Sequence, residues 1–208
     1  MKSPPDNVVV IGAGGHAKVV IATVRAAGGE VVAAYDDDET RWGDTVLGVR
    51  IEGPIDAEKV GRAPAIIAIG DNRVRQAIAA RLHATWISVR HPSSTMDRSA
   101  RVGPGTVIFA GSIIQADARI GAHCILNTLA NVDHDCIVGD FVHVGPGVTL
   151  CGGVTVDEGA LLGVGVKAVP NVEIGAWSTA GAGAVCVVDV PRDTTVVGVP
   201  ARAIEAAP

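Results

Sequence analysis

The chain has 208 residues, of which 48% are hydrophobic and 19% charged, so its composition excludes a disordered protein and suits one ordinary domain or two small ones. The formal net charge of −5 and the aromatic content of 3% are unlike the basic, aromatic surfaces of nucleic-acid binders, so we expect no nucleic-acid partner. The sequence has no run of about 18 apolar residues and no signal-peptide pattern, so we expect a cytoplasmic protein without membrane insertion.

The first part of the chain alternates apolar runs with segments of helical spacing. An apolar run at 7–11 passes through a glycine turn into a helical segment, and a second apolar run follows at 31–35. A third run at 65–69 precedes another helical segment. This β-α-β order predicts a small Rossmann-like α/β domain over residues 1–92, which is too short for a complete dinucleotide-binding domain.

The last helix of this domain is predicted after the third apolar run, with Val74, Ile78 and Leu82 on one apolar face. The alternation of strands and helices stops at residues 91–94, where we expect a short linker. A second domain is therefore expected over residues 93–208.

From Met96 onward the chain has a different period. An apolar residue recurs every six residues from Met96 to Leu162, and the frame continues to Cys186, with a small or β-branched residue four places after each apolar one. This period fits neither an α-helix nor a free strand, but it is typical of a parallel β-helix of hexapeptide repeats, here with about five coils. Cys124, Cys136 and Cys186 fall at inward positions, so we expect them to be packing residues.

The two halves together resemble a known family. The resemblance rests on the glycine turn with its histidine at 12–16, the stretch VDHDC at 132–136, the stretch GDFVH at 139–143 and the ending GVPAR at 198–202. These motifs resemble the NeuD/PglD-like sugar acetyltransferases, which join a small Rossmann-like domain to a left-handed parallel β-helix. The resemblance implies a homotrimer with active sites between subunits and acetyl-CoA as co-substrate.

His134 is the candidate general base. It lies two places after the inward Val132 and two before the inward Cys136, so its side chain is expected to point outward at a coil corner. Such a histidine is either a solvated surface residue or a base whose neutral form is available near pH 7. Asp133 and Asp135 flank it, and spacing does not decide which one orients the imidazole. The resemblance implies that His134 is the base and that Asp135 orients it.

The resemblance also places acetyl-CoA in a groove between neighbouring subunits. His143 is expected near the thioester carbonyl, and Asn127 is either a donor to substrate or cofactor or a turn former. The other residues expected along the groove are small residues that let a pantetheine arm approach the backbone, and one lysine for a phosphate: Gly152, Gly163, Val164, Gly165, Lys167, Gly181 and Ala182.

The glycine turn of the first domain offers backbone N–H groups at a helix N-terminus, which suits an anion. By the usual fingerprint the following acidic cluster would bind the ribose of NAD, but the half-fold is incomplete and a hexapeptide repeat follows. The resemblance implies that this pocket holds the nucleotide of the substrate instead. Its expected residues are Gly14, Gly15 and His16 at the diphosphate, Asp36 and Asp37 at the ribose or base, and Gly70 and Asn72 at the closing edge.

The resemblance implies an acetyl-CoA-dependent N-acetyltransferase acting directly on the C4 amine of a nucleotide-linked 4-amino-4,6-dideoxy sugar. GDP-perosamine is favoured and a UDP-linked sugar is the next choice, and no metal is expected. Three alternatives stay open. They are an O-acetyltransferase of the sialic acid type, a zinc hydratase of the γ-carbonic-anhydrase type using His123, His134 and His143, and a noncatalytic sugar-nucleotide sensor.

Overall fold

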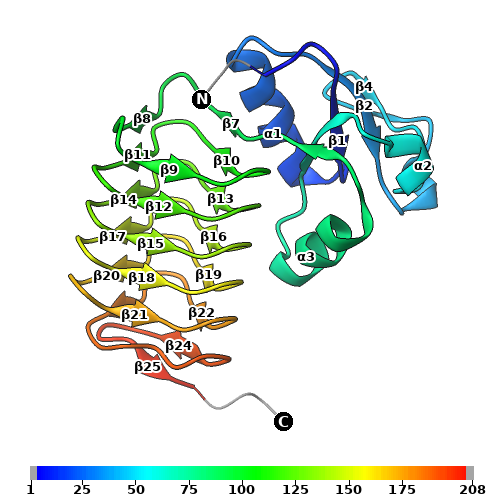
Figure 1. Ribbon diagram of the computed structural model, residues 1–208. Coiled ribbons are helices and arrows are strands. Elements are labelled where there is room, and N and C mark those ends of the chain that lie inside the picture. Colours follow the sequence, from blue (N-terminus) through cyan, green and yellow to red (C-terminus); the bar gives the residue numbers. More distant parts are fainter. Residues whose placement is uncertain (1–3, 205–208) are drawn as a thin grey trace.

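A four-stranded parallel sheet forms the core of the first domain in the computed structural model, which describes residues 4–204 (Figure 1). The outermost residues of the two expected domains, 1–3 and 205–208, lie outside this range. The strands lie in the order β2-β1-β5-β6, so the expected β-α-β unit is present. The elements are β1 (Val8–Ile11), α1 (Gly15–Ala26), β2 (Val31–Tyr35), η1 (Glu39–Arg41), β3 (Thr45–Val46), β4 (Val49–Arg50), α2 (Ala57–Val60), β5 (Pro64–Ile67), α3 (Asn72–Arg81) and β6 (Thr85–Trp86).

Helix α1 forms where the sequence predicts it because its apolar residues recur at helical spacing. Ala17, Val20, Ile21 and Val24 are all 0% exposed and face the sheet core. Helix α3 differs from the prediction. Ile78 and Leu82 are buried, but Val74 is 45% exposed, because the buried face of the helix carries Asn72 and Arg75 instead.

The rest of the described chain is a parallel β-solenoid with three faces (Figure 1). We name its sheets in the order in which the chain visits them. Sheet 1 contains β7 (Val89–Arg90), β10 (Val107–Ile108), β13 (Ile125–Leu126), β16 (His143–Val144), β19 (Leu161–Leu162), β22 (Thr179–Ala180), β24 (Thr195–Val197) and the antiparallel β25 (Arg202–Ala203). Sheet 2 contains β8 (Thr95–Met96), β11 (Ile113–Ile114), β14 (Asn131–Val132), β17 (Thr149–Leu150), β20 (Lys167–Ala168) and β23 (Val185–Cys186). Sheet 3 contains β9 (Arg101–Val102), β12 (Arg119–Ile120), β15 (Ile137–Val138), β18 (Thr155–Val156) and β21 (Glu173–Ile174).

Each coil places residues 18 positions apart in one column, as the register of Val107 with Ile125 shows. The apolar residue of every hexapeptide points inward, and the solenoid core is continuous from Ala100 to Ala201. The solenoid has more coils than the sequence predicts, which is about five. Its sheet 1 starts at β7, within the segment expected in the first domain, and runs through β24 to the antiparallel β25, so it extends beyond the hexapeptide frame of residues 96–186 at both ends.

The first domain packs on the outer face of sheet 1 and on the corner between sheets 3 and 1. Outward residues of sheet 1, Val107, Phe109 and Ile125, share one buried cluster with β1 and α1. Among residues 4–204, every helix is too short or too polar to span a membrane.

Arg75 of α3 joins the two domains through a guanidinium group that is 1% exposed. Its Nε donates to the carbonyl of His123 at 2.8 Å, and its Nη2 donates to the carbonyl of Phe141 at 2.8 Å, both in the solenoid. Its Nη1 donates to the carbonyls of Ile69 and Gly70 within the first domain. A buried cation is costly unless its donors are satisfied, so these bonds hold α3 firmly against the solenoid corner.

We expect Arg75→Met to lower the free energy of unfolding by about 3 kcal/mol or more, because it leaves several carbonyl groups buried without a donor. Chemical unfolding followed by circular dichroism measures this loss. Arg73→Met on the same helix is the control, since Arg73 is exposed and stacks on Trp177 at 4.4 Å, a contact worth about 1 kcal/mol or less. Equal losses in both variants would contradict the role given to Arg75.

Candidate active site

His134 lies on the corner between sheets 2 and 3, after β14 and before β15, and its side chain is 61% exposed. Its Nδ1 lies 2.8 Å from Oδ2 of Asp135, and its backbone N–H donates to Oδ1 of Asp133 at 2.7 Å. The two aspartates therefore contact different parts of the histidine. Asp135 contacts the imidazole, whereas Asp133 holds the backbone of the corner.

Asp135 has a φ of 60°, in the left-handed region that aspartate tolerates better than most residues. The same corner position is occupied by Asp117, Gly153 and Asn171 in other coils, all with positive φ. The coil corner therefore requires this backbone conformation, and the short Asp135 carboxylate reaches the neighbouring ring from it.

The space around the His134 ring is kept open by Gly152, one coil further on. A Cβ atom on Gly152 would lie 2.5 Å from the imidazole. A depression of about 420 Å³ adjoins the ring and is also lined by Cys151 and Asn171. The hydrogen bond that the ring donates to Asp135, followed by the charge of Asp133, raises the pKa of His134 above its ordinary value of 6.5. The corner therefore favours a proton on this imidazole.

A second group of polar residues lies where α1 meets sheet 1. The ring centroids of His16 and His143 are 6.2 Å apart, and His16 also makes an edge contact with Phe109 at 5.4 Å. The amide Nδ2 of Asn127 lies 3.2 Å from Nε2 of His143. His143 is only partly exposed, because the first domain covers much of it.

The histidines of this group are held neutral. Burial, followed by the charge of Arg75, lowers the pKa of His143 to about 4, and burial with His143 lowers the pKa of His16 to about 4. Nε2 of His16 is buried without a hydrogen-bond partner among residues 4–204. An unsatisfied buried nitrogen is costly, which is the state expected of a group that meets a ligand.

The glycine turn opens beside this group. Gly14 caps α1 without a side-chain hydrogen bond, and a Cβ on Gly14 or Gly15 would meet no atom within 4 Å. By contrast, a Cβ on Gly12 would lie 2.7 Å from Ile69, so Gly12 serves the packing of the turn. The first amides of α1 are therefore accessible to an anion.

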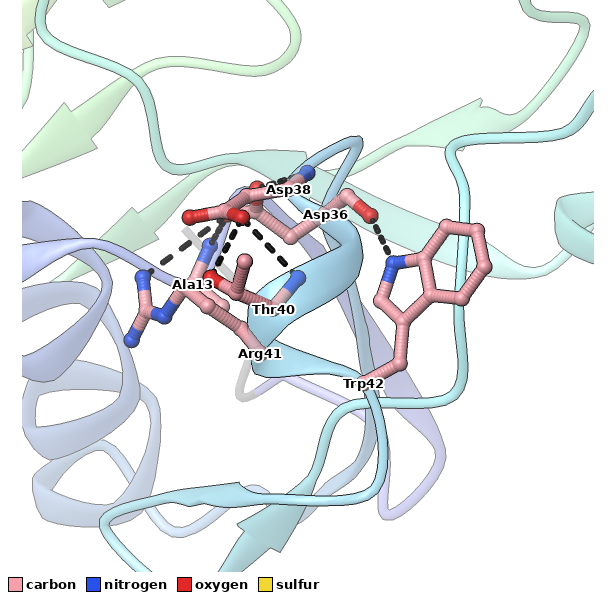
Figure 2. A network of polar contacts seen from close by, with 6 residues as sticks. All are labelled: Ala13, Asp36, Asp38, Thr40, Arg41 and Trp42. Atoms are coloured by element: carbon pink, nitrogen blue, oxygen red, sulfur yellow. Dashed lines mark hydrogen bonds and ion pairs between the residues drawn. The ribbon is translucent and has the colours of Figure 1, made fainter.

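Figure 2 shows that the acidic cluster after β2 is bonded to the turn itself. Oδ2 of Asp36 accepts from the backbone N–H of Ala13 at 2.6 Å, and Arg41 lies 4.0 Å away. The backbone carbonyl of Asp36 accepts from the indole of Trp42 at 2.8 Å. Asp36 thus braces the glycine turn, and its carboxylate is already engaged there.

Two other expected pocket residues have structural contacts. Asp37 accepts from the backbone of Ile55 at 2.8 Å and from Arg81 at 3.2 Å. Asn72 is 8% exposed and donates to the carbonyls of Gly159 and Ala160 in the solenoid. The Asn72 side chain therefore joins the two domains at their interface, where helix α3 buries it, rather than facing the glycine turn.

Some residues expected along the cofactor groove are packed against the next coil, and others are exposed. A Cβ on Gly163 would lie 2.8 Å from the backbone of Ala182, and one on Gly181 would lie 2.8 Å from Val197, so coil stacking requires both glycines. Val164 is 59% exposed and Lys167 is exposed on sheet 2. Gly165 has open space around it, but its φ of 70° favours glycine.

The two groups lie on opposite sides of one coil. His134 is on the corner between sheets 2 and 3, which in a three-faced solenoid is opposite sheet 1, whereas His143 begins a strand of sheet 1. The ring of His123 is stacked on that of Phe141, with centroids 5.2 Å apart, at the corner between sheets 3 and 1. The three histidines therefore do not converge within one copy of the chain, and residues 4–204 of that copy contain no cluster able to hold a metal ion.

Several residues of this region were not found from the sequence. Phe109 and Arg75 line the histidine group from the two domains, Arg41 lies by the glycine turn, and Cys151 lines the His134 depression. Only Arg75 left a sequence signal, because it shares helical spacing with the apolar Ile78 and Leu82.

The two groups are expected to titrate in different ranges. In a histidine NMR titration, His134 should take up its proton above pH 6.5, whereas His143 should stay neutral until about pH 4. Because an unfolded His143 binds a proton near its ordinary pKa of 6.5, stability should fall as pH drops through the window from 6.5 to 4. His143→Gln serves to assign the resonance. A His143 signal that titrates near pH 6.5 would contradict the burial argument.

The chain is similar in sequence and in structure to known proteins. Residues 7–82 match the family described as the PglD N-terminal domain. GDP-perosamine N-acetyltransferase of Escherichia coli O157:H7 is 33% identical over 150 residues, which are 68% of this chain and 68% of that protein.

Two solved structures extend the likeness over almost the whole chain. PerB from Caulobacter crescentus, solved in complex with CoA and GDP-perosamine, has 42% sequence identity and a TM-score of 0.90, and the match covers 96% of this chain and 97% of that one. The acetyltransferase domain of PglB from Neisseria gonorrhoeae, in complex with acetyl coenzyme A, has 36% identity and a TM-score of 0.89, covering 97% of this chain and 100% of that one. The expected Rossmann-like domain with a left-handed β-helix is thus confirmed, and the chain belongs to the NeuD/PglD-like family of sugar acetyltransferases.

Proposed function

We propose that the chain transfers the acetyl group of acetyl-CoA to the C4 amine of a nucleotide-linked 4-amino-4,6-dideoxy sugar, with GDP-perosamine as first choice and a UDP-linked sugar as second. Membership of the family makes the chain an acyltransferase with acetyl-CoA as co-substrate. The 2.8 Å contact between His134 and Asp135, beside an open depression, is the observation that supports acetyl transfer to an amine at this corner.

His134 acts as the general base. With Nδ1–H donating to Asp135, the other ring nitrogen, Nε2, presents its lone pair to the substrate. The sugar amine attacks the thioester carbonyl, the C–N bond forms, and His134 takes the proton from nitrogen. The C–S bond then breaks, and the CoA thiolate takes the proton from His134 and leaves as the thiol. Asp135 and Asp133 stabilise the imidazolium that forms, in keeping with the raised pKa of His134.

The buried group near the glycine turn holds the substrates. A neutral His143 and the Asn127 amide suit hydrogen bonding to an acyl carbonyl without a full charge, and the unsatisfied Nε2 of His16 suits a sugar hydroxyl or phosphate oxygen. The amides of Gly14 and Gly15 take the diphosphate.

The position of His134 supports a site shared between two copies of the chain. Since its corner is opposite the sheet that carries the first domain, the nucleotide held by one copy meets the His134 of a neighbour. Exposed apolar residues on sheets 2 and 3, Ile113 and Ile137, supply surface for such a contact. We propose the homotrimer expected for the family.

The first test is thiol release from acetyl-CoA with a panel of UDP-, GDP- and dTDP-linked 4-amino-4,6-dideoxy sugars. We expect turnover with one of them and a loss of at least about a hundredfold in kcat for His134→Ala, the usual range for a general base. Cys151→Ala is the control, because Cys151 lines the same depression and direct attack needs no thiol.

The same panel includes sugars with a hydroxyl group at C4. Turnover of the hydroxyl compounds alone would replace N-acetylation with O-acetylation. Full activity of His134→Ala, or loss of activity in Cys151→Ala with an acetylated protein intermediate, would overturn the direct mechanism.

Mixing two inactive variants tests the shared site. His134→Ala removes the base, and His16→Ala with Gly15→Val blocks the nucleotide pocket of the same chain. If each site joins two copies, unfolding and refolding the variants together should restore part of the activity, because some interfaces then pair an intact pocket with an intact His134. No recovery in mixed assemblies of normal size would place the whole site within one copy.

A further inference from the structure

Two arginines lie side by side on the outer face of sheet 3. Arg101 of β9 and Arg119 of β12 are register partners on neighbouring parallel strands, and both are exposed. Arg101 donates only to backbone carbonyls of residues 98–100, and neither arginine forms an ion pair within residues 4–204. Like charges on directly paired strands destabilise a sheet, so folding does not account for the pair.

The pair lines a depression that adjoins the catalytic corner. This depression, of about 700 Å³, is lined by Ser99, Arg101, Asp117, Arg119, Asp135 and Ile137. Asp135 also lines the depression around His134, so the two hollows meet at this residue. Its carboxylate is engaged by the imidazole, which leaves Asp117 as the other acidic group facing the two guanidinium groups.

The spacing of the arginines suits the substrate. Ile137 lies in the same coil as His134, and its register partner Arg119 lies in the preceding coil. Arg119 is therefore one strand spacing, about 4.8 Å, from the coil of His134, and Arg101 is one spacing further away. In a 4-amino sugar nucleotide, a single hexose ring separates the C4 nitrogen from the anomeric oxygen that carries the diphosphate. A sugar with its amine at His134 therefore brings its diphosphate within reach of the long side chain of Arg119 on the preceding coil.

We propose that Arg101 and Arg119 form an anion site that binds the diphosphate of the nucleotide sugar whose amine lies at His134. The inference rests on the proposed function and adds a binding site to it. Planar guanidinium groups pair with phosphate oxygens through two parallel hydrogen bonds, which a lysine cannot match. The diphosphate is then held from both sides, by the glycine turn of one copy and by the arginines of its neighbour.

The first measurement is steady-state kinetics on Arg101→Gln, Arg119→Gln and the double variant. We expect the KM for the nucleotide-linked amino sugar to rise about tenfold in each single variant and further in the double variant, with an unchanged KM for acetyl-CoA. Arg119→Lys should recover only part of the loss. Added salt should raise the KM of the unchanged protein more than that of the double variant.

Arg62→Gln is the matched control for the loss of one positive charge. Arg62 is exposed and precedes β5, so it lies at the amino end of the parallel sheet, opposite the edge that carries the glycine turn. Its KM values should equal those of the unchanged protein. An equal KM rise in Arg62→Gln would indicate a general charge effect and overturn the site.

A binding experiment separates this inference from the proposed function. Calorimetry with GDP, UDP and inorganic pyrophosphate needs no turnover, and we expect the double variant to bind each of them at least about tenfold more weakly. If no amino sugar is acetylated but this difference is present, the proposed function fails and the anion site stands. Equal binding by both proteins overturns the site.

Light scattering on the same samples tests the competing role of the pair as a contact between copies. We expect the double variant to keep the oligomeric state of the unchanged protein. A shift to smaller species would show that the arginines meet carboxylates of a neighbour, and it would also overturn the anion site.

Discussion

The return of the chain to the same column after 18 residues is the constraint on which the rest of the structure depends. Because each coil repeats the backbone of the previous one, the corner that holds His134 also requires a positive φ at Asp135. In the following coil, the position equivalent to His134 is Gly152, which has no side chain to occupy the space beside the imidazole. The same register puts His134 and His143 on opposite sides of the solenoid. The geometry of the corner that holds His134 is therefore a consequence of the repeat.

The buried guanidinium group of Arg75 is the second organising interaction. It ties helix α3 to the carbonyls of two solenoid corners, and in doing so it places a positive charge close to His16, His123 and His143. Burial and this charge both disfavour protonation of the three rings. One residue thus contributes to the docking of the domains and to the neutral state of the histidines beside them.

The two candidate groups then have opposite electrostatic environments. His134 is exposed and paired with carboxylates, which raises its pKa, while His143 is buried near a cation, which lowers its pKa to about 4. Titratable groups whose surroundings push their pKa values apart are typical of sites in which one group accepts a proton and another stays neutral as a hydrogen-bonding partner. The proposed acetyl transfer uses both, brought together from two copies of the chain.

The sequence by itself determined the fold class, because the β-α-β order and the six-residue period each follow from which residues are apolar. It also determined that His134 points outward, since its place in the frame excludes it from the core. It did not decide between Asp133 and Asp135, because both flank the histidine and only the left-handed backbone at Asp135 turns that carboxylate onto the ring. The burial of His143 and the interface role of Asn72 were decided by tertiary structure alone, since they arise where the first domain covers the solenoid, and no local pattern records contacts between residues so distant in the chain.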